Sequence, residues 1–270
     1  MMKIVYIYFL FTTLLLACQK EKVVVIHDGS TIRLNKNDSL VMIKFHESMG
    51  GFGWDLKDCN TWQYVTFEYD SLLNESFVVA IQGGVGFMQQ QGEIPKEIGE
   101  LSRLRIFFVQ DISNRLGGVL PMEIFNCPLE YFHVEANIFG ELTSDVSKIA
   151  NTIHHFYVQG TCLSGQLPRE FGLFKNLVSP LGLLNNRFSG FLPKEFSSIK
   201  GGVFLLQNNI STIEWEFFDT PLNEAWEVIM WGNQLKGEIP EHVFDTEYWK
   251  AFSRSFTSQQ TGYGFSNFRF

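Results

Sequence analysis

The sequence is short of the residues on which most enzyme and metal sites depend. It contains four cysteines in 270 residues, and no two of them have the CxxC spacing of zinc or redox sites. It also lacks a serine nucleophile elbow, an HExxH helix and a phosphate-binding loop. We therefore expect no catalytic residue, no metal and no cofactor. Positive charge is scarce too: the formal net charge is −8 and the pI is near 5.3, which argues against nucleic acid as a partner.

A hydrophobic run long enough to cross a membrane comfortably is also missing. The longest apolar stretch, Ile4 to Leu16, follows a lone positive charge at Lys3 and has the pattern of a signal peptide, which we assign to residues 1–17. It ends in Leu-Leu-Ala-Cys at Cys18. This resembles a bacterial lipobox and implies cleavage before Cys18 and lipidation of its thiol. The alternative is an ordinary signal peptide followed by an incidental cysteine.

Residues 18–36 would then tether the protein to a membrane, and several acyl chains on one cysteine make such anchoring firm. This predicts an outer-membrane lipoprotein of the cell envelope and leaves open whether it faces the periplasm or the cell surface. The mixed charges of Gln19 to Lys22 give only a weak version of the acidic export signal of Bacteroidetes lipoproteins. Cys59, Cys127 and Cys162 are an odd number, for which buried free thiols are favoured over a disulfide.

The sequence is rich in one repeated phrase, Leu-x-Gly-x-Leu/Ile-Pro. The phrase ends at Pro168, Pro193 and Pro240, and shorter forms of it end at Pro95 and Pro121. Successive prolines are 25 or 26 residues apart, or 47 where a degenerate unit intervenes. A period near two dozen residues is typical of leucine-rich repeats. A series of independent hairpins would not keep one phase over such a length.

Each unit contains an alternating apolar pair, such as Phe107 with Val109 or Phe132 with Val134, which marks one face of a short strand. Stacked in parallel, these strands would form a continuous core in which phenylalanine often replaces leucine, since the chain has 27 Phe. A polar residue follows each strand, and we expect its side chain to bond backbone groups of the turn. This column is predicted as Asn114, Asn137, Thr161, Asn186, Asn209 and Asn233.

These units resemble those of plant-type leucine-rich-repeat proteins and of leucine-rich-repeat lipoproteins of Bacteroidetes. The resemblance covers residues 37–244. It implies an α/β solenoid with a curved parallel β-sheet on the concave side and with turns and short 3-10 or helical segments on the convex side. About seven units, some degenerate, would occupy residues 77–244. They would lie between an N-terminal cap at 37–76 and a C-terminal cap at 245–270.

The N-terminal cap resembles that of the plant proteins, in which a helix, a Gly-Gly pair and two tryptophans cover the open end of the first repeat. Asp-Ser-Leu at Ser39 and at Ser71 also resembles a Bacteroidetes acceptor for O-linked glycans, although Asp38 is equally suited to cap a helix. The expected features of the cap are an apolar helix face with Leu40 and Ile43, which Phe45 could extend, an N-cap at Asn37 or Asp38, and tryptophan plugs at Trp54 and Trp62.

Strand residues that alternate with the core positions should point to the concave face. Many of them are aromatic or histidine, whereas a solvated face without a role would favour Lys, Glu, Ser and Thr. Exposed aromatic residues gather at interaction sites because they bury a large area at a low entropic cost. The candidate ligand-binding residues are Phe108, Tyr131, His133, Glu135, Tyr157, Gln159, Trp226 and Trp231.

Two alternatives stay open for this face. Some of the rings could only stack on one another along the sheet. A metal site at His133, Glu135, His154 and His155 is a weaker hypothesis, because neighbouring residues of a strand alternate between its faces. The assigned register places Phe204 and Leu206 in the core, and Leu205 and Gln207 on the concave face.

Taken together, these features predict a non-catalytic binding module that recognises a protein, a peptide or a glycan across its concave face. The alternative is a structural or assembly subunit of an envelope complex, which would dock through its side or its caps. A glycan-active enzyme is a third and weaker hypothesis, for which Glu135 and Glu227 are the first carboxylates to test.

Overall fold

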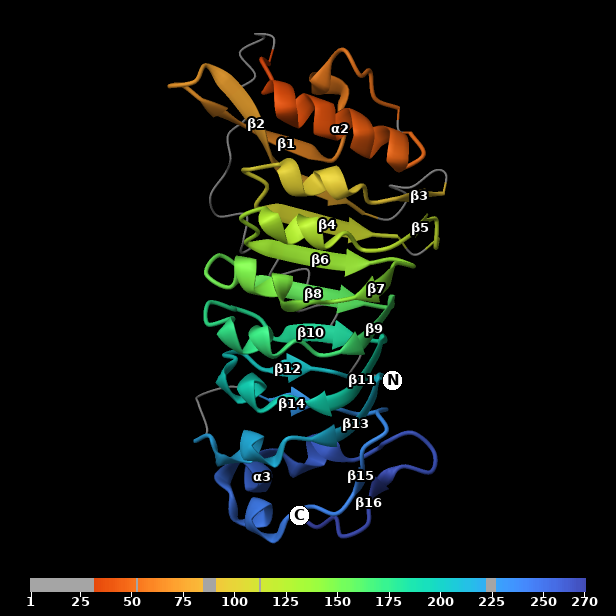
Figure 1. The fold of residues 1–270 in the computed structure, drawn as a ribbon, viewed down its shortest axis with the longest axis vertical. Helices are drawn as coiled ribbons and strands as arrows, with labels where there is room; N and C mark the ends of the chain where they lie inside the picture. The colour runs from red at the N-terminus through yellow and green to blue at the C-terminus, as the bar shows by residue number, and fades with distance from the viewer. Residues whose placement is uncertain (1–31, 52, 85–90, 112, 222–226) are drawn as a thin grey trace.

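Successive repeats stack into one elongated body with their strands side by side (Figure 1). The computed structural model describes residues 32–51, 53–84, 91–111, 113–221 and 227–270. Its main sheet has eight strands, and every pair is parallel except β1 with β2, as expected for a leucine-rich-repeat sheet. In spatial order the strands are Val65–Asp70 (β1), Glu75–Gly83 (β2), Ile106–Gln110 (β4), Tyr131–Glu135 (β6), His155–Gln159 (β8), Leu181–Leu184 (β10), Val203–Phe204 (β12) and Val228–Ile229 (β14).

A second layer of short strands follows the turn of each repeat. Four of them form a parallel sheet and the others pair in twos, β3 with β5 and β15 with β16. Their bounds are Gly92–Glu93 (β3), Leu116–Gly117 (β5), Phe139–Glu141 (β7), Cys162–Gln166 (β9), Arg187–Leu192 (β11), Asn209–Ile213 (β13), Lys236–Gly237 (β15) and Gly264–Phe265 (β16).

The prolines of the repeat phrase mark the starts of 3-10 helices. Pro95, Pro121, Pro168, Pro193 and Pro240 each occupy an N-cap. Proline suits this place because its φ is fixed near the value required and it has no N–H to satisfy. The helices are Lys96–Glu100 (η2), Met122–Asn126 (η3), Ser144–Ile149 (η4), Arg169–Leu173 (η5), Lys194–Ser198 (η6), Trp215–Asp219 (η7) and Glu241–Asp245 (η8).

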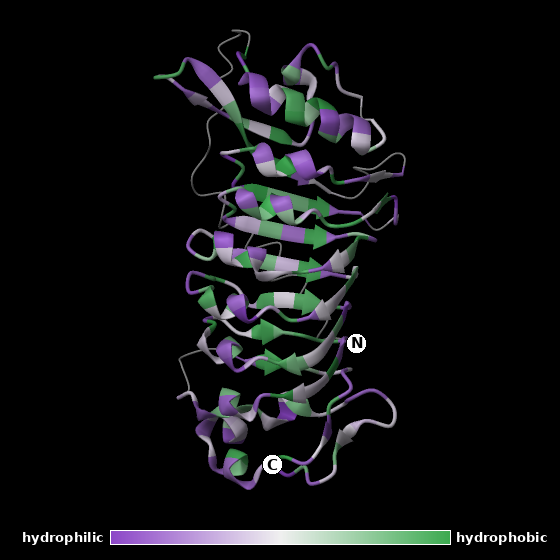
Figure 2. Ribbon diagram, in the orientation of Figure 1, coloured by the Kyte–Doolittle hydropathy of each residue, from purple (hydrophilic) through white to green (hydrophobic). Residues whose placement is uncertain are grey.

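The core lies between the main sheet and these helices, and phenylalanine fills much of it, as predicted. Phe107, Phe132 and Phe156 of successive strands are fully buried, with ring centroids 6.0 and 5.0 Å apart. The hydropathy colouring shows apolar residues along the main-sheet strands (Figure 2). Because each layer covers the next, the core is continuous along the body.

The polar column in the turns is confirmed at Thr161, Asn186 and Asn233, all of which are buried. The Asn186 side chain donates to Val158 O at 3.0 Å and accepts from Thr161 N at 3.2 Å. Asn233 donates to Leu205 O at 2.8 Å and accepts from Ile210 N at 3.1 Å. Each amide therefore joins neighbouring turns.

The other three predicted members are wrong. Asn208, not Asn209, is buried and accepts from Phe188 N at 3.1 Å. Asn137 is exposed, whereas Ala136 just before it is buried. Asn114 is exposed as well, and in its repeat the buried Asp111 accepts from the backbone N–H groups of Arg115 and Leu116, both at 2.6 Å. A carboxylate can serve because it accepts several bonds at once.

The predicted register of β12 is wrong by one residue. Phe204 pairs with Gly182 and Ile229, while Val203 and Leu205 are fully buried. Phe204 therefore belongs to the concave face, and Leu205 belongs to the core. A shift of one residue exchanges the two faces of a strand, and a run of apolar residues on both sides of the position hides the shift in the sequence.

The N-terminal cap is a helix, Lys36–Ser48 (α2), with an antiparallel β1–β2 pair. Asn35 is its N-cap, not Asn37 or Asp38, and its side chain accepts from the N–H groups of residues 37 and 38. Asp38 is buried and accepts from Val78 N at 2.8 Å, which ties the helix to β2. The buried face of α2 is Val41, Met42 and Phe45, so the expectation for Phe45 is confirmed. Leu40 is 53% exposed and Ile43 only partly buried, so the predicted places of these two are wrong.

Both tryptophan plugs are confirmed. Trp54 and Trp62 are buried and stack with ring centroids 5.3 Å apart. Of the two candidate acceptor serines, Ser39 lies half-buried within α2, and Ser71 is exposed in the turn between β1 and β2. Cys59, Cys127 and Cys162 are free thiols, and burial raises the pKa of Cys127 to about 12.

The far end of the body is closed by a helix, Glu247–Phe252 (α3), and a 3-10 turn, Ser253–Phe256 (η9). Tyr248 and Trp249 are buried against the last repeat, and Phe252 packs on the same core. Among the residues described, no helix is long and apolar enough to cross a membrane. The predicted signal peptide at 1–17 and the predicted lipidation site Cys18 lie outside the described residues.

Candidate functional site

The concave face, which is the outward side of the main sheet, carries a cluster of stacked rings on β4, β6 and β8. Because side chains alternate along a strand, residues between the core positions Phe107 and Val109 and their equivalents point to this side. Figure 1 shows these three strands lying side by side near the N-terminal half. We call the cluster the aromatic ladder; its members are Phe108, Tyr131, His133, His155 and Tyr157.

The ladder has two rows that run across the strands. In one row, the ring centroids of Phe108 and His133 are 4.9 Å apart, and those of His133 and Tyr157 are 5.0 Å apart. In the other row, Tyr131 and His155 stack at 4.2 Å with their planes 12° apart. The rows also touch, because His133 and His155 lie 5.9 Å apart. The structure therefore brings together the predicted ligand-binding residues of these strands. It also adds His155, which was not among the candidate ligand-binding residues.

Tyr157 lies flat across the next strand, and a glycine makes this possible. A Cβ atom at Gly182 would lie 2.0 Å from Cδ2 of the Tyr157 ring. The ring is consequently only 4% exposed, and its hydroxyl donates to Gln159 Oε1 at 2.8 Å. Tyr157 is thus covered by its neighbours. This agrees with the alternative that some of these rings only stack on one another along the sheet.

The two ladder histidines are buried without charge at neutral pH. Burial lowers the pKa of His133 to about 3 and that of His155 to about 4, and the nearby His155 adds to the effect on His133. Nδ1 of His155 lies 2.8 Å from the Ser179 hydroxyl, and neither ring nitrogen of His133 has a hydrogen-bond partner among the described residues. In the described ranges no group of three or more His, Cys, Asp or Glu side chains is placed to hold a metal ion.

The accessible part of this region is its rim. Phe108, Tyr131, Glu135 and Gln159 are all half-buried, and Glu135 accepts from Gln110 Nε2 at 2.6 Å. We call these four residues the concave rim. It combines two aromatic faces with a carboxylate and an amide. Such a mixture suits contact with a partner that has both apolar and hydrogen-bonding groups.

The remaining candidates lie elsewhere. Trp231 follows β14, three strands beyond β8, which places it about 14 Å along the sheet from Tyr157. It is 40% exposed, and its indole N–H donates to Arg254 O at 3.1 Å. Trp226 lies outside the described residues. In β12 the residue that faces outward is Phe204 and not Leu205, as described above.

The fold and this face define a leucine-rich-repeat solenoid of the plant type. The structure is similar to a plant ice-binding protein (19% identity, TM-score 0.59, 77% of this chain and 66% of that one). It is also similar to the leucine-rich-repeat ectodomain of the Arabidopsis thaliana receptor kinase GASSHO1/SCHENGEN3, solved with Casparian strip integrity factor 2 (17%, 0.54, 78% and 28%). A third is pollen receptor kinase 3 (21%, 0.53, 72% and 94%).

At these identities the likeness concerns the fold alone. The chain spans less than two thirds of the first two of these proteins. No protein-family model matches the sequence, and the search among curated proteins gave no match.

Proposed function

We propose that this protein is a non-catalytic binding module that recognises a protein or peptide partner through the concave rim. The observation that carries the proposal is the aromatic ladder, in which the buried rings of His133 and His155 support the half-buried rings of Phe108 and Tyr131 in an uncharged surface. Rigid aromatic surfaces bind well because little side-chain entropy is lost on contact. The ligand-bound ectodomain of GASSHO1/SCHENGEN3 shows that a solenoid of this fold can hold a partner, which supports the same use here.

The rim also argues for binding without catalysis. Glu135 is engaged by Gln110, and Glu227 accepts from the Ser255 hydroxyl at 3.2 Å on a distant part of the body. Since β6 and β14 are four strands apart in the main sheet, these two carboxylates do not form the close pair that a glycosidase would need. A glycan is the second ligand class that we propose for the same rim, because sugars stack on aromatic faces.

The proposed location is the cell envelope, with the lipid on Cys18 as the anchor. The sequence of residues 1–18 supports this, through its charge, apolar run and lipobox-like end. Cys18→Ser should abolish incorporation of labelled palmitate. Protease applied to intact cells should then tell a surface protein, which is digested, from a periplasmic one, which is protected until the cells are opened.

Affinity capture with matched variants tests the binding role. The lipid-free mature chain, its Tyr131→Ser/Gln159→Ala variant and a Leu173→Ser control would be incubated with envelope and host proteins, and the captured proteins quantified. Leu173 is 52% exposed on η5, on the convex side. A binding module should lose its partner only in the rim variant. An assembly subunit that docks by its convex side should lose it only in the Leu173 variant.

A further inference from the structure

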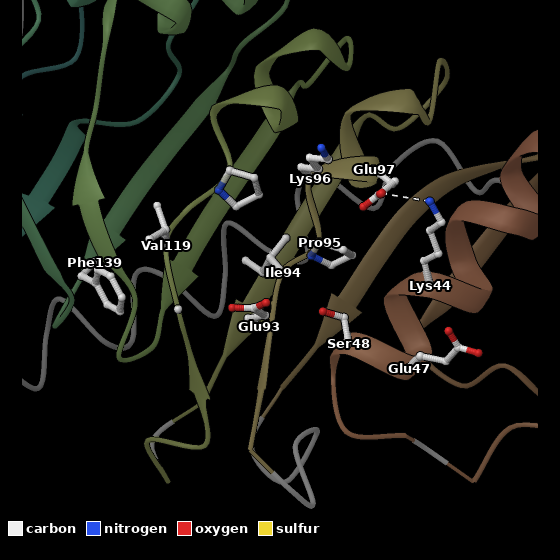
Figure 3. Close-up of a pocket in the computed structure, with 12 residues that line it drawn as sticks. Lys44, Glu47, Ser48, Glu93, Ile94, Pro95, Lys96, Glu97, Val119 and Phe139 are labelled. Atoms are coloured by element: carbon white, nitrogen blue, oxygen red, sulfur yellow. Dashed lines mark hydrogen bonds and ion pairs between the residues drawn. The ribbon is translucent and has the colours of Figure 1, made fainter.

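A groove of about 760 Å³ lies between the N-terminal cap and the first repeats. Its walls come from the end of α2, from the segment that joins β3 to η2, and from the turns near β5 and β7 (Figure 3). None of the residues that line it belongs to a strand of the main sheet, so it is separate from the concave rim. Its size is within the range of small-molecule and peptide sites.

The floor of the groove carries an exposed apolar pair, Val119 and Phe139. Val119 and Phe139 are 55% and 49% exposed and form a parallel β-bridge. In this bridge Phe139 N donates to Gly118 O and Leu120 N donates to Phe139 O, both at 3.0 Å. In the two following repeats the place of Phe139 is taken by Ser164 and Ser189, whose hydroxyls bond the turn of the preceding repeat at 3.4 Å. This local change gives an exposed apolar pair that the repeat itself does not require.

A carboxylate lies beside this apolar pair, on the side of Ser48 (Figure 3). Glu93 lies over the turn at Gly118, where an added Cβ would come within 2.8 Å of its Oε2. No ion pair to Glu93 is found among the described residues, whereas the nearby Glu97 is paired with Lys44 at 2.9 Å. In Figure 3 the Ser48 hydroxyl points toward Glu93, and the ends of Glu47 and Lys96 point away from the centre.

We propose that this groove binds an extended peptide segment of a partner protein that carries a large apolar side chain next to a lysine or an arginine. The apolar side chain would cover Val119 and Phe139, and the cation would pair with Glu93 and hydrogen-bond Ser48. Charge complementarity selects this occupant: a cation pairs with the Glu93 carboxylate, whereas an acyl chain would cover it without a partner, which is costly.

Selection of random heptapeptides displayed on phage, against the full mature chain, provides the probes. The enriched heptapeptides should share an apolar residue adjacent to Lys or Arg. Their affinities would then be measured by fluorescence anisotropy with synthetic, labelled copies. Glu93→Gln should weaken binding about tenfold, as expected for loss of one charge-assisted hydrogen bond. Val119→Ser/Phe139→Ser, which gives Phe139 the serine of its neighbours, should weaken it at least as much.

Two controls match these changes. Glu238→Gln alters an exposed glutamate at the same place in the last repeat phrase, and Val178→Ser alters a side chain that is 63% exposed far along the chain. Both should bind as the unchanged protein does, and so should the rim variant Tyr131→Ser. All altered side chains are at least partly exposed, so thermal unfolding midpoints should match and rule out misfolding as the cause.

Three results would overturn the proposal: selection that enriches no peptide or only acidic ones, enriched peptides that bind the groove variants with unchanged affinity, or equal losses in the controls. A concentration-dependent dimer that Phe139→Ser dissociates would assign the groove to a second copy of the chain, and this too would overturn the peptide proposal.

Discussion

The two halves of the solenoid hold their repeats together by different means. In the N-terminal half, β4, β6 and β8 have five residues each, and their outward side chains stack as the aromatic ladder. In the C-terminal half, β12 and β14 have two residues each. Their outward residues are Phe204 and Ile229, which continue the row that contains Gly182 of β10. There the buried amides of Asn186, Asn208 and Asn233 bond the turns.

This difference shows that the contacts between neighbouring repeats can be made at different positions of the repeat. Where Ala136 and Asp111 replace the asparagine, longer strands and stacked rings supply the contacts between units. Where the strands are short, the amide bonds add to the backbone bonds that Val203 and Leu205 make to the next strand. As a result, the aromatic ladder lies in the N-terminal half, and two of its rings are part of the concave rim.

The largest effect is expected from Asn208→Ala, which removes an amide that donates to Leu183 O at 2.7 Å and accepts from Phe188 N. We expect a loss of about 3 kcal/mol in the free energy of unfolding, because several buried backbone groups lose their partners. Asn209→Ala, one residue further on, should cost less than about 1 kcal/mol. Urea unfolding measures both, and equal losses would contradict the assigned column.

Acid should weaken the N-terminal half through His133. Its folded pKa of about 3 is below the value of 6.5 expected in the unfolded chain, so the unfolded chain takes up the proton first as the pH falls. The stabilising contribution is therefore complete above pH 6.5 and is lost progressively from there toward pH 3.

His133→Phe keeps a ring between Phe108 and Tyr157 and removes this titration. Between pH 8 and pH 5 the unchanged protein should lose about 2 kcal/mol more than the variant. The measurement is urea unfolding at each pH, and parallel pH profiles for the two proteins would show that His133 does not titrate as expected.

Gly182→Ala should displace the Tyr157 ring and cost about 1.5 kcal/mol, since overfilled sites typically lose stability on this scale. In a Tyr157→Ala background the same change should cost almost nothing. This double-mutant cycle isolates the contact between the two positions. Additive losses would mean that the glycine is needed for some other reason.

The smallest effect is expected from Trp231→Phe, which removes one hydrogen bond to Arg254 at a side chain that is 40% exposed. A loss of about 0.5 kcal/mol follows from a single exposed bond. A loss comparable to that of Asn208→Ala would show that Trp231 is structural in a way that its exposure does not reveal.

The sequence was sufficient to predict the repeat architecture, because the Pro95 to Pro240 spacing and the alternating apolar pairs both express the same periodic contacts. The sequence was insufficient where two adjacent residues are alike and only one of them is buried. Asn208 and Asn209 are both asparagine, and Val203 to Leu206 are all apolar, so only three-dimensional packing selects the buried one. In the site, the strand register brought out Tyr131, His133 and Tyr157. The depth at which His133 and Tyr157 are covered depends on Gly182 and on stacking between strands, which no local pattern contains.

The central claim is that the concave rim is the surface on which a partner lies. The most direct measurement is photo-cross-linking in intact cells, with a benzophenone amino acid at Gln159 on the rim or at Leu173 on the convex side. The account predicts a discrete cross-linked partner from position 159 and none from position 173. Cross-linking from position 173 alone would contradict it.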